Sequence, residues 1–453
     1  MRSTSRSMPS RTRRRAIICV LTSAALVLTA CGDDDDAASG GTAAPSSDAP
    51  ADEPGETAAA DDTTAPAATE APDATAGEAT GEPIKVMTEA PVDSQVAPYP
   101  NIKGASEVYE QWINDRGGIA GRPLEVIFCD DRADAAEAAN CARTAAEEGV
   151  VANVGSFTID ASRAIPILEE AQIPWFGACC PIVAQENTSA ISFPMGCVAC
   201  FPPAAAIKMV EDECQEIVQV YGDLPVADVF AGLFANGYTS TGNDPSGLKV
   251  VKIPLEPGDY SAQAAEIGEA DCVFGNISEI NWPSLITALS GLGASPRLYG
   301  PQGNLNAVIA EQFPAETEGA FVFNVYPSIT ADVWAEYEQA LVDYDADPDL
   351  DWNSLAGLGT WAAFTAFKQI AEAVEGDITN VSFLEQANKT DALDTGGMVG
   401  VMNFTEEWDG GGGQFPRIFN RTIFVDEIKG GVLTPVDGVA YDMTNPFDGL
   451  PAE

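Results

Sequence analysis

The sequence predicts an α/β protein whose folded part consists of two lobes built on parallel sheets. From Pro83 to Glu453 the chain has about 370 residues, which is more than one hydrophobic core usually holds. Along this part, short apolar runs alternate with stretches of helical periodicity. Such alternation is typical of parallel sheets covered by helices on both faces, the doubly wound α/β class.

Strands are expected where short apolar runs end at turn residues. Seven runs fit this description: 124–128, 150–154, 173–176, 217–221, 249–253, 272–274 and 319–325. Helices are expected between the early strands and again late in the chain, at 104–116, 133–148, 162–171 and 355–374. Because helical stretches separate these runs, neighbouring strands are expected to be parallel.

Two of the expected helices carry apolar stripes that we assign to the core. In the helix at 104–116, apolar residues recur every three to four positions, and the helix ends at Gly117-Gly118, where a left-handed cap needs no Cβ. The helix at 355–374 has the same periodicity. We interpret both stripes as packing surfaces and not as cofactor sites. Their residues are Ala105, Val108, Tyr109, Trp112, Ile113, Trp361, Phe364 and Phe367.

The first 31 residues have the anatomy of an export signal. A cluster of arginines precedes an apolar run at 16–30, which is shorter than the roughly 20 residues that cross a bilayer, so an uncleaved membrane anchor is the weaker alternative. The run Leu28-Thr29-Ala30-Cys31 resembles the lipobox of bacterial lipoproteins. The sequence therefore predicts a signal peptide and lipobox at 1–31, lipidation of Cys31, and anchoring on the extracytoplasmic face of the cell membrane.

Residues 32–82 are expected to form a disordered acidic tether. This tract is rich in Ala, Thr, Pro, Asp and Glu and has almost no large apolar side chains. It cannot bury enough surface to offset the entropy lost on ordering. Such a segment would hold the folded domain away from the membrane.

The charge and composition exclude several functions. The formal net charge is −47, and so acidic a surface repels nucleic acid. The chain contains no histidine, so Ser-His-Asp and Cys-His catalysis and His-ligated metals are excluded. We expect no enzymatic activity, no cofactor and no metal.

The cysteines predict disulfides. Of the ten, one leaves with the signal peptide and one would be lipidated, and the even number that remains is typical of bridges in an exported chain. The favoured pairs are Cys129 with Cys141, which joins a strand end to the next helix, and Cys214 with Cys272, which joins neighbouring strands. The sequence does not pair the other four: Cys179, Cys180, Cys197 and Cys200.

Residues 105–131, which read ASEVYEQWINDRGGIAGRPLEVIFCDD, resemble the first helix, turn and second strand of branched-chain amino-acid-type solute-binding proteins of ABC transporters. Further matches follow in the family's order and together span most of residues 84–405. Each short piece is unspecific, but the ordered set is specific. The matching pieces are Val154-Gly155-Ser156, Ile173-Pro174, Gly258-Asp259-Tyr260-Ser261-Ala262-Gln263, Tyr299-Gly300-Pro301-Gln302-Gly303 and Glu318-Gly319-Ala320.

This resemblance implies the type I periplasmic-binding fold, with two Rossmann-like lobes, three crossovers between them and the ligand in the cleft. Lobe 1 is expected at 83–203 plus 327–400 and lobe 2 at 204–326 plus 401–453. The resemblance also implies a function: the chain would capture a small polar molecule, such as an amino acid, an amide or a related compound, and deliver it to an ABC transporter permease. We expect a monomer.

Ligand-binding residues are expected beyond the carboxyl ends of the strands. In the first lobe, the loops 155–158 and 177–180 have this position, and in the family the corresponding loops bind the ligand carboxylate through hydroxyls and backbone N–H groups. Ser156 and Thr158 offer hydroxyls here, although Ser156 could instead cap the next helix. The expected ligand-binding residues are Ser156, Phe157, Thr158, Ala178, Cys179, Cys180, Asn276, Ser278, Glu279, Gln302 and Tyr326.

Three residues depart from the pattern of the family's amino-acid binders. Ile159 stands where a second hydroxyl is common, and Pro181, which has no N–H, stands where a threonine often donates. Gln302 stands where those proteins have a glutamate that neutralises the ligand's ammonium group. Either Glu279 supplies the missing charge, or the ligand is not an ordinary amino acid. We favour an amide, a carboxylate or another neutral polar compound.

Other functions were weighed against solute uptake. An enzyme has little support, because Ser246-Gly-Leu-Lys249 opens no helix and the glycines at 410–413 lack the lysine of a phosphate loop. A ligand-binding sensor would use the same hinge closure and present its closed state to a signalling partner. A disulfide redox protein would use the pair Cys197 and Cys200 and would need a reactive thiol of lowered pKa.

Overall fold

The fold is described from a computed structural model, which covers residues 79–94 and 98–452. The signal peptide and lipobox expected at 1–31 lie outside these residues, as does the tether expected at 32–82 apart from residues 79–82. Within the described residues, no helix is long and apolar enough to cross a membrane. The same part of the chain contains no group of three or more His, Cys, Asp and Glu side chains that could hold a metal ion.

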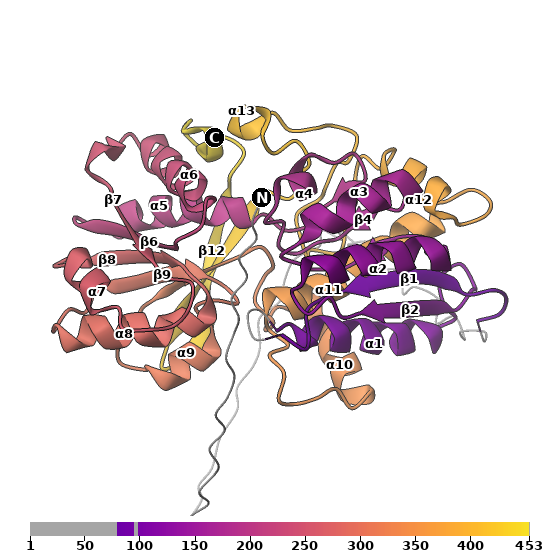
Figure 1. Cartoon of the computed structure of the whole chain (residues 1–453), viewed down its shortest axis with the longest axis horizontal. Helices are drawn as coiled ribbons and strands as arrows, with labels where there is room; N and C mark the ends of the chain where they lie inside the picture. The colour runs from indigo at the N-terminus through magenta and orange to yellow at the C-terminus, as the bar shows by residue number, and fades with distance from the viewer. Residues whose placement is uncertain (1–78, 95–97, 453) are drawn as a thin grey trace, which may run out of the picture. The chain divides into compact units, whose positions relative to one another are not determined.

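The first lobe is built on a five-stranded parallel sheet in the order β2-β1-β3-β4-β5 (Figure 1). Successive side chains of β1 point to opposite faces, so Val86 packs in the same core cluster as α1 and α11, whereas Met87 packs with α2 and α3. Helices therefore cover both faces, as expected. The strands are β1 (Ile84–Glu89), β2 (Leu124–Cys129), β3 (Asn153–Val154), β4 (Trp175–Phe176) and β5 (Ser192–Phe193).

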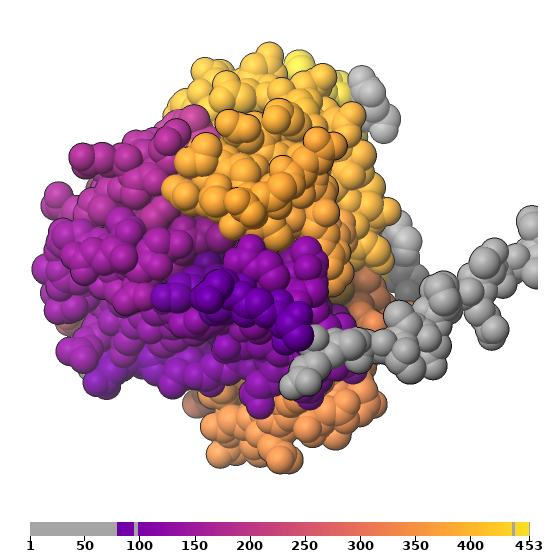
Figure 2. All heavy atoms as spheres, turned by 90° about the vertical axis from the view of Figure 1, so that its right-hand side faces the viewer, coloured from indigo at the N-terminus to yellow at the C-terminus, as the bar shows by residue number. Residues whose placement is uncertain are grey.

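The helices of the first lobe come from two distant parts of the chain. Figure 2 shows late residues, in orange and gold, on the same surface as the indigo and magenta residues of the early chain. The early helices are α1 (Pro100–Asn114), α2 (Ala135–Glu148), α3 (Ala161–Ala171) and α4 (Ala184–Thr188). The late ones are α10 (Ala335–Asp343), α11 (Leu355–Glu372) and α12 (Asn380–Ala387).

The two apolar stripes expected to be core do pack against each other. The ring of Trp361 on α11 lies 4.8 Å from that of Tyr109 and 5.0 Å from that of Trp112, both on α1. Phe364 lies 5.1 Å from Tyr109. These aromatic contacts join the beginning of the folded chain to a helix about 250 residues later.

The second lobe is built on a seven-stranded sheet in the order β12-β11-β10-β9-β8-β6-β7. The strands from β6 to β10 are parallel, but β11 and β12 are antiparallel, which the expectation of purely parallel sheets missed. A short connection can join only antiparallel neighbours, and Gly430-Gly431 forms such a turn. The strands are β6 (Ile217–Gly222), β7 (Lys249–Ile253), β8 (Cys272–Asn276), β9 (Arg297–Pro301), β10 (Phe321–Asn324), β11 (Thr422–Lys429) and β12 (Val432–Asp442).

Helices also cover both faces of the second sheet. On β6, Val220 lies in one core cluster and Tyr221 in the other, so both faces are buried. The helices are α5 (Phe201–Glu211), α6 (Ala227–Ser240), α7 (Ser261–Ile267), α8 (Trp282–Gly291) and α9 (Ala307–Gln312). The glycines that lack the lysine of a phosphate loop form a single irregular turn, α13 (Gly410–Gly413), with left-handed backbone at Gly411 and Gly412.

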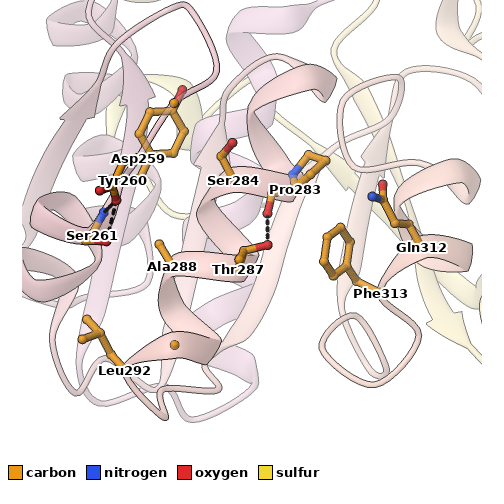
Figure 3. Close-up of a pocket in the computed structure, with 12 residues that line it drawn as sticks. Asp259, Tyr260, Ser261, Pro283, Ser284, Thr287, Ala288, Leu292, Gln312 and Phe313 are labelled. Atoms are coloured by element: carbon orange, nitrogen blue, oxygen red, sulfur yellow. Dashed lines mark hydrogen bonds between the residues drawn. The ribbon is translucent and has the colours of Figure 1, made fainter. Parts of the chain in front are cut away.

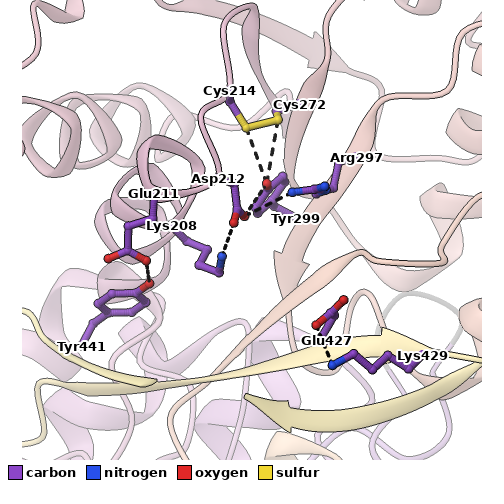
Figure 4. Close-up of polar contacts among 10 residues, drawn as sticks. All are labelled: Lys208, Glu211, Asp212, Cys214, Cys272, Arg297, Tyr299, Glu427, Lys429 and Tyr441. Atoms are coloured by element: carbon purple, nitrogen blue, oxygen red, sulfur yellow. Dashed lines mark hydrogen bonds and ion pairs between the residues drawn. A yellow bond between two sulfur atoms is a disulfide. The ribbon is translucent and has the colours of Figure 1, made fainter. Parts of the chain in front are cut away.

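A disulfide and a polar cluster fasten the amino-terminal ends of β6 and β8. Figure 4 shows the Tyr299 hydroxyl between Asp212 and the bridge from Cys214 to Cys272. The hydroxyl donates a hydrogen bond of 2.8 Å to Asp212, which also pairs with Lys208 on α5. The cluster ties α5 to the amino-terminal ends of the strands. A ligand is expected at the other ends, the carboxyl ends.

The chain passes between the lobes three times: from β5 to α5, from β10 to α10, and into β11. For the division into lobes, we propose that residues 401–419, expected with the second lobe, belong to the first. The ring of Phe404 lies 5.2 Å from that of Phe193 on β5, and the Arg417 Nε donates a hydrogen bond of 2.8 Å to the carbonyl of Ser192. Apolar contacts with Phe193 of the five-stranded sheet hold Phe404 and Phe419, whereas Trp408 and Phe415 pack against Phe447.

Candidate ligand-binding cavity

A cavity of about 390 Å³ lies where strands of both sheets end. Phe157 and Cys180 line it from the loops after β3 and β4. Asn276 at the end of β8 and Gln302 directly after β9 line it from the second lobe. This position beyond the carboxyl ends of parallel strands is where open α/β sheets bind ligands.

Glycines allow the two first-lobe loops to lie close against α11. Gly155 and Gly177 have left-handed backbone, with φ of +64° and +77°. A Cβ on Gly177 would lie 2.3 Å from the Cβ of Ala363. Each loop therefore turns where only glycine fits without strain.

Aromatic side chains from both lobes form the apolar part of the wall. Tyr99, which precedes α1, and Phe157 meet edge to face with their ring centroids 4.7 Å apart. Phe201 of α5 and Phe230 of α6 line the cavity from the second lobe. Of these four, the sequence predicted only Phe157.

The two hydroxyls predicted to bind ligand do not line the cavity. The Ser156 hydroxyl accepts a hydrogen bond of 2.8 Å from the backbone N–H of Glu89 and contacts Asn153. The Thr158 hydroxyl accepts one of 3.1 Å from the N–H of Asp160. Both side chains are buried, and Ser156 links the ends of β1 and β3. The alternative role for Ser156 also fails, because α3 begins at Ala161 with Asp160 as its N-cap.

The loop 177–180 brings one predicted side chain to the cavity. Cys180 lines it, while Ala178 and Cys179 are buried behind. Ala178 accepts backbone hydrogen bonds from Met195 and Gly196, which ties the loop to the segment after β5.

The structure contains three disulfides among the described cysteines. The two favoured pairs, Cys129–Cys141 and Cys214–Cys272, are both present. Cys197 pairs with Cys200. Cys179 and Cys180 are not bonded, so the expectation that every remaining cysteine forms a bridge is not met.

The cysteines do not have the properties of a redox centre. Cys197 and Cys200 are fully buried. A hydrogen bond with Cys179, together with burial, raises the pKa of the Cys180 thiol. Redox catalysis needs an accessible thiol whose pKa is lowered. These properties do not favour a disulfide redox protein.

In the second lobe, the structure brings three of the five predicted residues to the cavity: Asn276, Glu279 and Gln302. Ser278 is exposed beside them and does not line it. Tyr326 is fully buried, and its ring lies 6.3 Å from that of Trp334, in the first-lobe core. It is a packing residue at the second crossover.

Gln302 joins the two lobes across the cavity. Its Nε2 donates a hydrogen bond of 2.5 Å to the backbone carbonyl of Asn353, which precedes α11. Gln302 is 2% exposed, and its Oε1 has no hydrogen-bond partner among the described residues. Here the glutamine has a structural role that a glutamate, which donates nothing when ionised, could not take.

Acidic side chains that the sequence did not single out also line the cavity. Asp349 and Asp351 lie in the segment before α11 and face the same space as Glu279. Burial raises the pKa of Glu279, and a hydrogen bond from Asn306 partly offsets this. Nearby protein atoms also raise the pKa of Asp351 by desolvation, although the residue is exposed and a hydrogen bond from the N–H of Asn353 partly offsets the shift. The acidic run from 343 to 351 was the available signal.

A second hollow, of about 460 Å³, lies on the outer side of the second lobe between α7, α8 and α9 (Figure 3). Its polar groups are used locally. Asp259 accepts a hydrogen bond of 2.9 Å from the N–H of Ser261 at the start of α7, and the Thr287 hydroxyl donates to the carbonyl of Pro283 within α8. The cavity at the strand ends is therefore the stronger candidate for a ligand site.

A family model described as "periplasmic binding protein" matches residues 100–415, which include most of both lobes and most residues that line the cavity. The chain belongs to the periplasmic binding protein family. The resemblance found in the sequence is thereby confirmed. No curated protein matches the chain.

Solved structures show the same fold over nearly their whole length. One is a possible leucine/isoleucine/valine-binding protein from Rhodopirellula baltica SH 1, with a TM-score of 0.66, 17% identity, and 80% of this chain and 98% of that one covered. Another is a fatty acid ABC transporter substrate-binding protein from Thermomonospora curvata, with a TM-score of 0.61, 19% identity, and 81% and 94% covered. This periplasmic binding protein thus has the two-lobed type I fold predicted from its sequence.

A third solved structure is a solute-binding protein from R. palustris in complex with benzoate. Its TM-score is 0.61 at 18% identity, with 78% of this chain and 96% of that chain covered. At such identities the likeness establishes the fold alone, so the ligand of this periplasmic binding protein has to be argued from its own cavity.

Proposed function

We propose that this periplasmic binding protein is an extracytoplasmic solute-binding lipoprotein that delivers a small polar molecule to the permease of an ABC transporter. The observation that carries the proposal is the cavity of about 390 Å³ whose wall comes from both lobes. A molecule bound there contacts both lobes at once and so favours the arrangement in which they close around it. A permease that recognises this arrangement would receive only loaded protein.

Binding, and not catalysis, fits the side chains of the cavity. Among its described lining residues, the thiol and the serine hydroxyl that could act as nucleophiles belong to Cys180 and Ser354. The Ser354 hydroxyl is occupied, because it caps α11 by accepting a hydrogen bond of 3.1 Å from the N–H of Gly357. The raised pKa of Cys180 keeps its thiol protonated and weakly nucleophilic. We propose that the protein is not an enzyme.

The lipid anchor is proposed from the signal and lipobox at 1–31. Mass spectrometry of the mature amino-terminal peptide should find diacylglycerol on Cys31. The Cys31→Ser variant should leave the membrane fraction or stay unprocessed. An unmodified amino-terminal peptide from the membrane fraction would contradict the anchor and leave the binding function intact.

The names of proteins with this fold refer to leucine, isoleucine, valine, fatty acids and benzoate. The fold therefore accommodates chemically different ligands, and a broad screen is needed. We would measure the thermal shift of the mature protein with amino acids, their amides, carboxylates, urea-like compounds, amines and polyols, since a ligand that binds the native state raises the melting temperature.

A matched pair of variants tests whether the ligand binds in this cavity. Val308 of α9 lines the cavity and is 54% exposed, so Val308→Trp narrows the cavity without disturbing the core. Val342 on α10 is 73% exposed and lies outside it. We expect Val308→Trp to weaken ligand binding by about tenfold or more and Val342→Trp to leave it unchanged. Equal affinity in both variants would place the ligand elsewhere.

Uptake separates a transporter component from a sensor. Cells that contain this protein and its permease should accumulate the labelled ligand, and cells without this protein should not. If binding is measured but uptake does not depend on the protein, the sensor alternative replaces the transport role. Size-exclusion chromatography with light scattering tests the expected monomer.

A further inference from the structure

The buried amides of the cavity present hydrogen-bond acceptors that nothing satisfies. Gln302 and Asn101 both line the cavity and are 2% and 8% exposed. Each gives its N–H groups to the segment before α11: Gln302 donates to the carbonyl of Asn353, and Asn101 donates to the carbonyl of Asp351 at 3.2 Å. Among the described residues, nothing donates to Gln302 Oε1 or to Asn101 Oδ1. A buried acceptor without a donor is costly, and both oxygens, which carry partial negative charge, are enclosed in the cavity wall.

The orientation of both amides is fixed by their partners. A backbone carbonyl can only accept, so the nitrogen of each amide must face it and the oxygen must face away. Turning either amide over would place two acceptors against each other. The unpaired atoms are therefore oxygens and not nitrogens.

The charged side chains of the cavity are all acidic. Glu279, Asp349 and Asp351 line it, and no lysine or arginine does so among the described residues. In that same part of the chain, none of the three carboxylates takes part in an ion pair. Carboxylates that line a cavity without a cation are stabilised when a ligand supplies one.

The apolar part of the wall suits a cation with a hydrocarbon portion. Tyr99 and Phe157 present aromatic rings beside the acidic residues, and Phe201 and Phe230 do so from the other lobe. Aromatic faces attract cations and bury apolar groups. The net charge of −47 would also raise the local concentration of cations around the protein.

A ligand carboxylate finds little to bind it here. The hydroxyls of Ser156 and Thr158 are turned into the protein and do not line the cavity. A carboxylate would instead face Glu279, Asp349 and Asp351, and like charges at close range repel. The same residues that attract an ammonium group therefore discriminate against an amino acid.

We infer that the ligand of this cavity is a small organic cation, an amine or guanidinium compound with an apolar portion and no carboxylate group. The inference rests on the proposed solute-binding function and narrows its ligand class. It departs from the amide, carboxylate or neutral compound expected from the sequence, because Gln302 removes one acid while Asp349 and Asp351 supply two others.

Compounds that share a carbon skeleton and differ in charge test the inference. We would measure the affinity of the mature protein by isothermal titration calorimetry for 2-phenylethylamine, phenylalanine and 3-phenylpropionate. A second series would contain 3-methylbutylamine, leucine and 4-methylpentanoate, and agmatine would represent guanidinium compounds. In at least one series, the affinity for the amine should exceed the affinities for the amino acid and the carboxylate of the same skeleton by about tenfold or more.

Two cavity variants and one control show whether the acids are responsible. Asp351→Asn and Glu279→Gln should each weaken amine binding by about tenfold. Glu338→Gln removes the same charge from an exposed position on α10 outside the cavity and should leave the affinity unchanged. Urea unfolding of the three variants and the original protein shows independently of any ligand whether the variants are folded.

The possible failures can be told apart. If an amino acid or carboxylate binds more tightly than the amine of the same skeleton, the cation inference is overturned while solute binding stands. If amines bind but the two cavity variants behave like Glu338→Gln, the assignment to these carboxylates is overturned. If neither the amines nor agmatine bind, the inference fails, and the broader thermal-shift screen decides separately whether the protein binds any solute.

Discussion

The sulfur atoms of Cys179 and Cys180 lie 2.6 Å apart at the wall of the ligand cavity. Cys180 lines the cavity and Cys179 lies behind it, 4% exposed. The two are adjacent in the chain and are the only cysteines among the described residues that are not in disulfides. They make the cavity sensitive to thiol chemistry.

We therefore expect slow, selective alkylation of Cys180. Its raised pKa leaves little thiolate at neutral pH, so iodoacetamide should react more slowly than with a free thiol, and faster as the pH rises. Peptide mass spectrometry of the folded protein should find the label on Cys180 and little on Cys179. Rapid labelling at pH 7 would contradict the raised pKa. Absence of both thiols after denaturation would show that the two sulfurs are bonded to each other.

The hydrogen bond from Gln302 to Asn353 predicts that a glutamate at this position destabilises the protein. In Gln302→Glu, an ionised carboxylate would replace a donor that faces the Asn353 carbonyl, at a cost of roughly 1–3 kcal/mol. Urea unfolding should show this cost at pH 7. At pH 4 the cost should shrink, because a protonated carboxyl group can donate to the carbonyl.

Gln302→Met is the control for this prediction. It removes the donor and the acceptor together and introduces no charge, so its effect should be the same at pH 7 and pH 4. A Gln302→Glu variant as stable as the original protein at pH 7 would mean that the hydrogen bond to Asn353 contributes nothing.

Glu186 predicts a pH dependence of stability. It is 1% exposed beneath the loop 177–183, and burial raises its pKa from 4.5 to about 7, although the N–H groups of Ile182 and Val183 donate to it. The folded state holds this proton up to about pH 7, whereas the unfolded chain releases it near pH 4.5. The contribution of this group to the free energy of unfolding is therefore fully present below about pH 4.5. It is lost as the pH rises to about 7, and the total loss is about 3 kcal/mol.

Urea unfolding between pH 4.5 and 7.5 checks this, with Glu186→Gln compared against Glu170→Gln. Glu170 is exposed on α3, so its variant removes the same charge and should keep the pH dependence of the original protein. Glu186→Gln should lack the part due to this group. If the free energy of unfolding changes with pH in the same way in Glu186→Gln and Glu170→Gln, the pKa of Glu186 is not raised in the folded state.

The three disulfides should differ in their contributions to stability because they close loops of different length. The sequence separations are 58 for Cys214–Cys272, 12 for Cys129–Cys141 and 3 for Cys197–Cys200. Loop-closure entropy gives about 4, about 3 and about 1.6 kcal/mol, respectively. Urea unfolding of the three paired Cys→Ser variants should follow this order. If removal of Cys197–Cys200 lowers the free energy of unfolding most, then packing and not loop closure determines what the disulfides contribute.

The strands and helices with clear periodicity were predictable, and their ends were less so. The helix expected at 104–116 is α1 (Pro100–Asn114), which starts earlier because proline is favourable in a first helical turn. The strand expected at 150–154 is only β3 (Asn153–Val154). β11 and β12 were missed, because a late antiparallel hairpin has no helix beside it to mark it.

Sequence alone determined the class of fold, the two lobes, the expected export signal and the two disulfide pairs with Cys129 and Cys214. Periodicity, chain length and spacing are local properties that a linear reading preserves. Tertiary structure decided what the cavity offers a ligand. Ser156 turns away because the backbone of Glu89 takes its hydroxyl, and packing of α11 against α1 brings Asp349 and Asp351 to strand ends about 200 residues earlier in the chain. Side-chain direction at a strand end depends on such distant partners, and no local pattern records them.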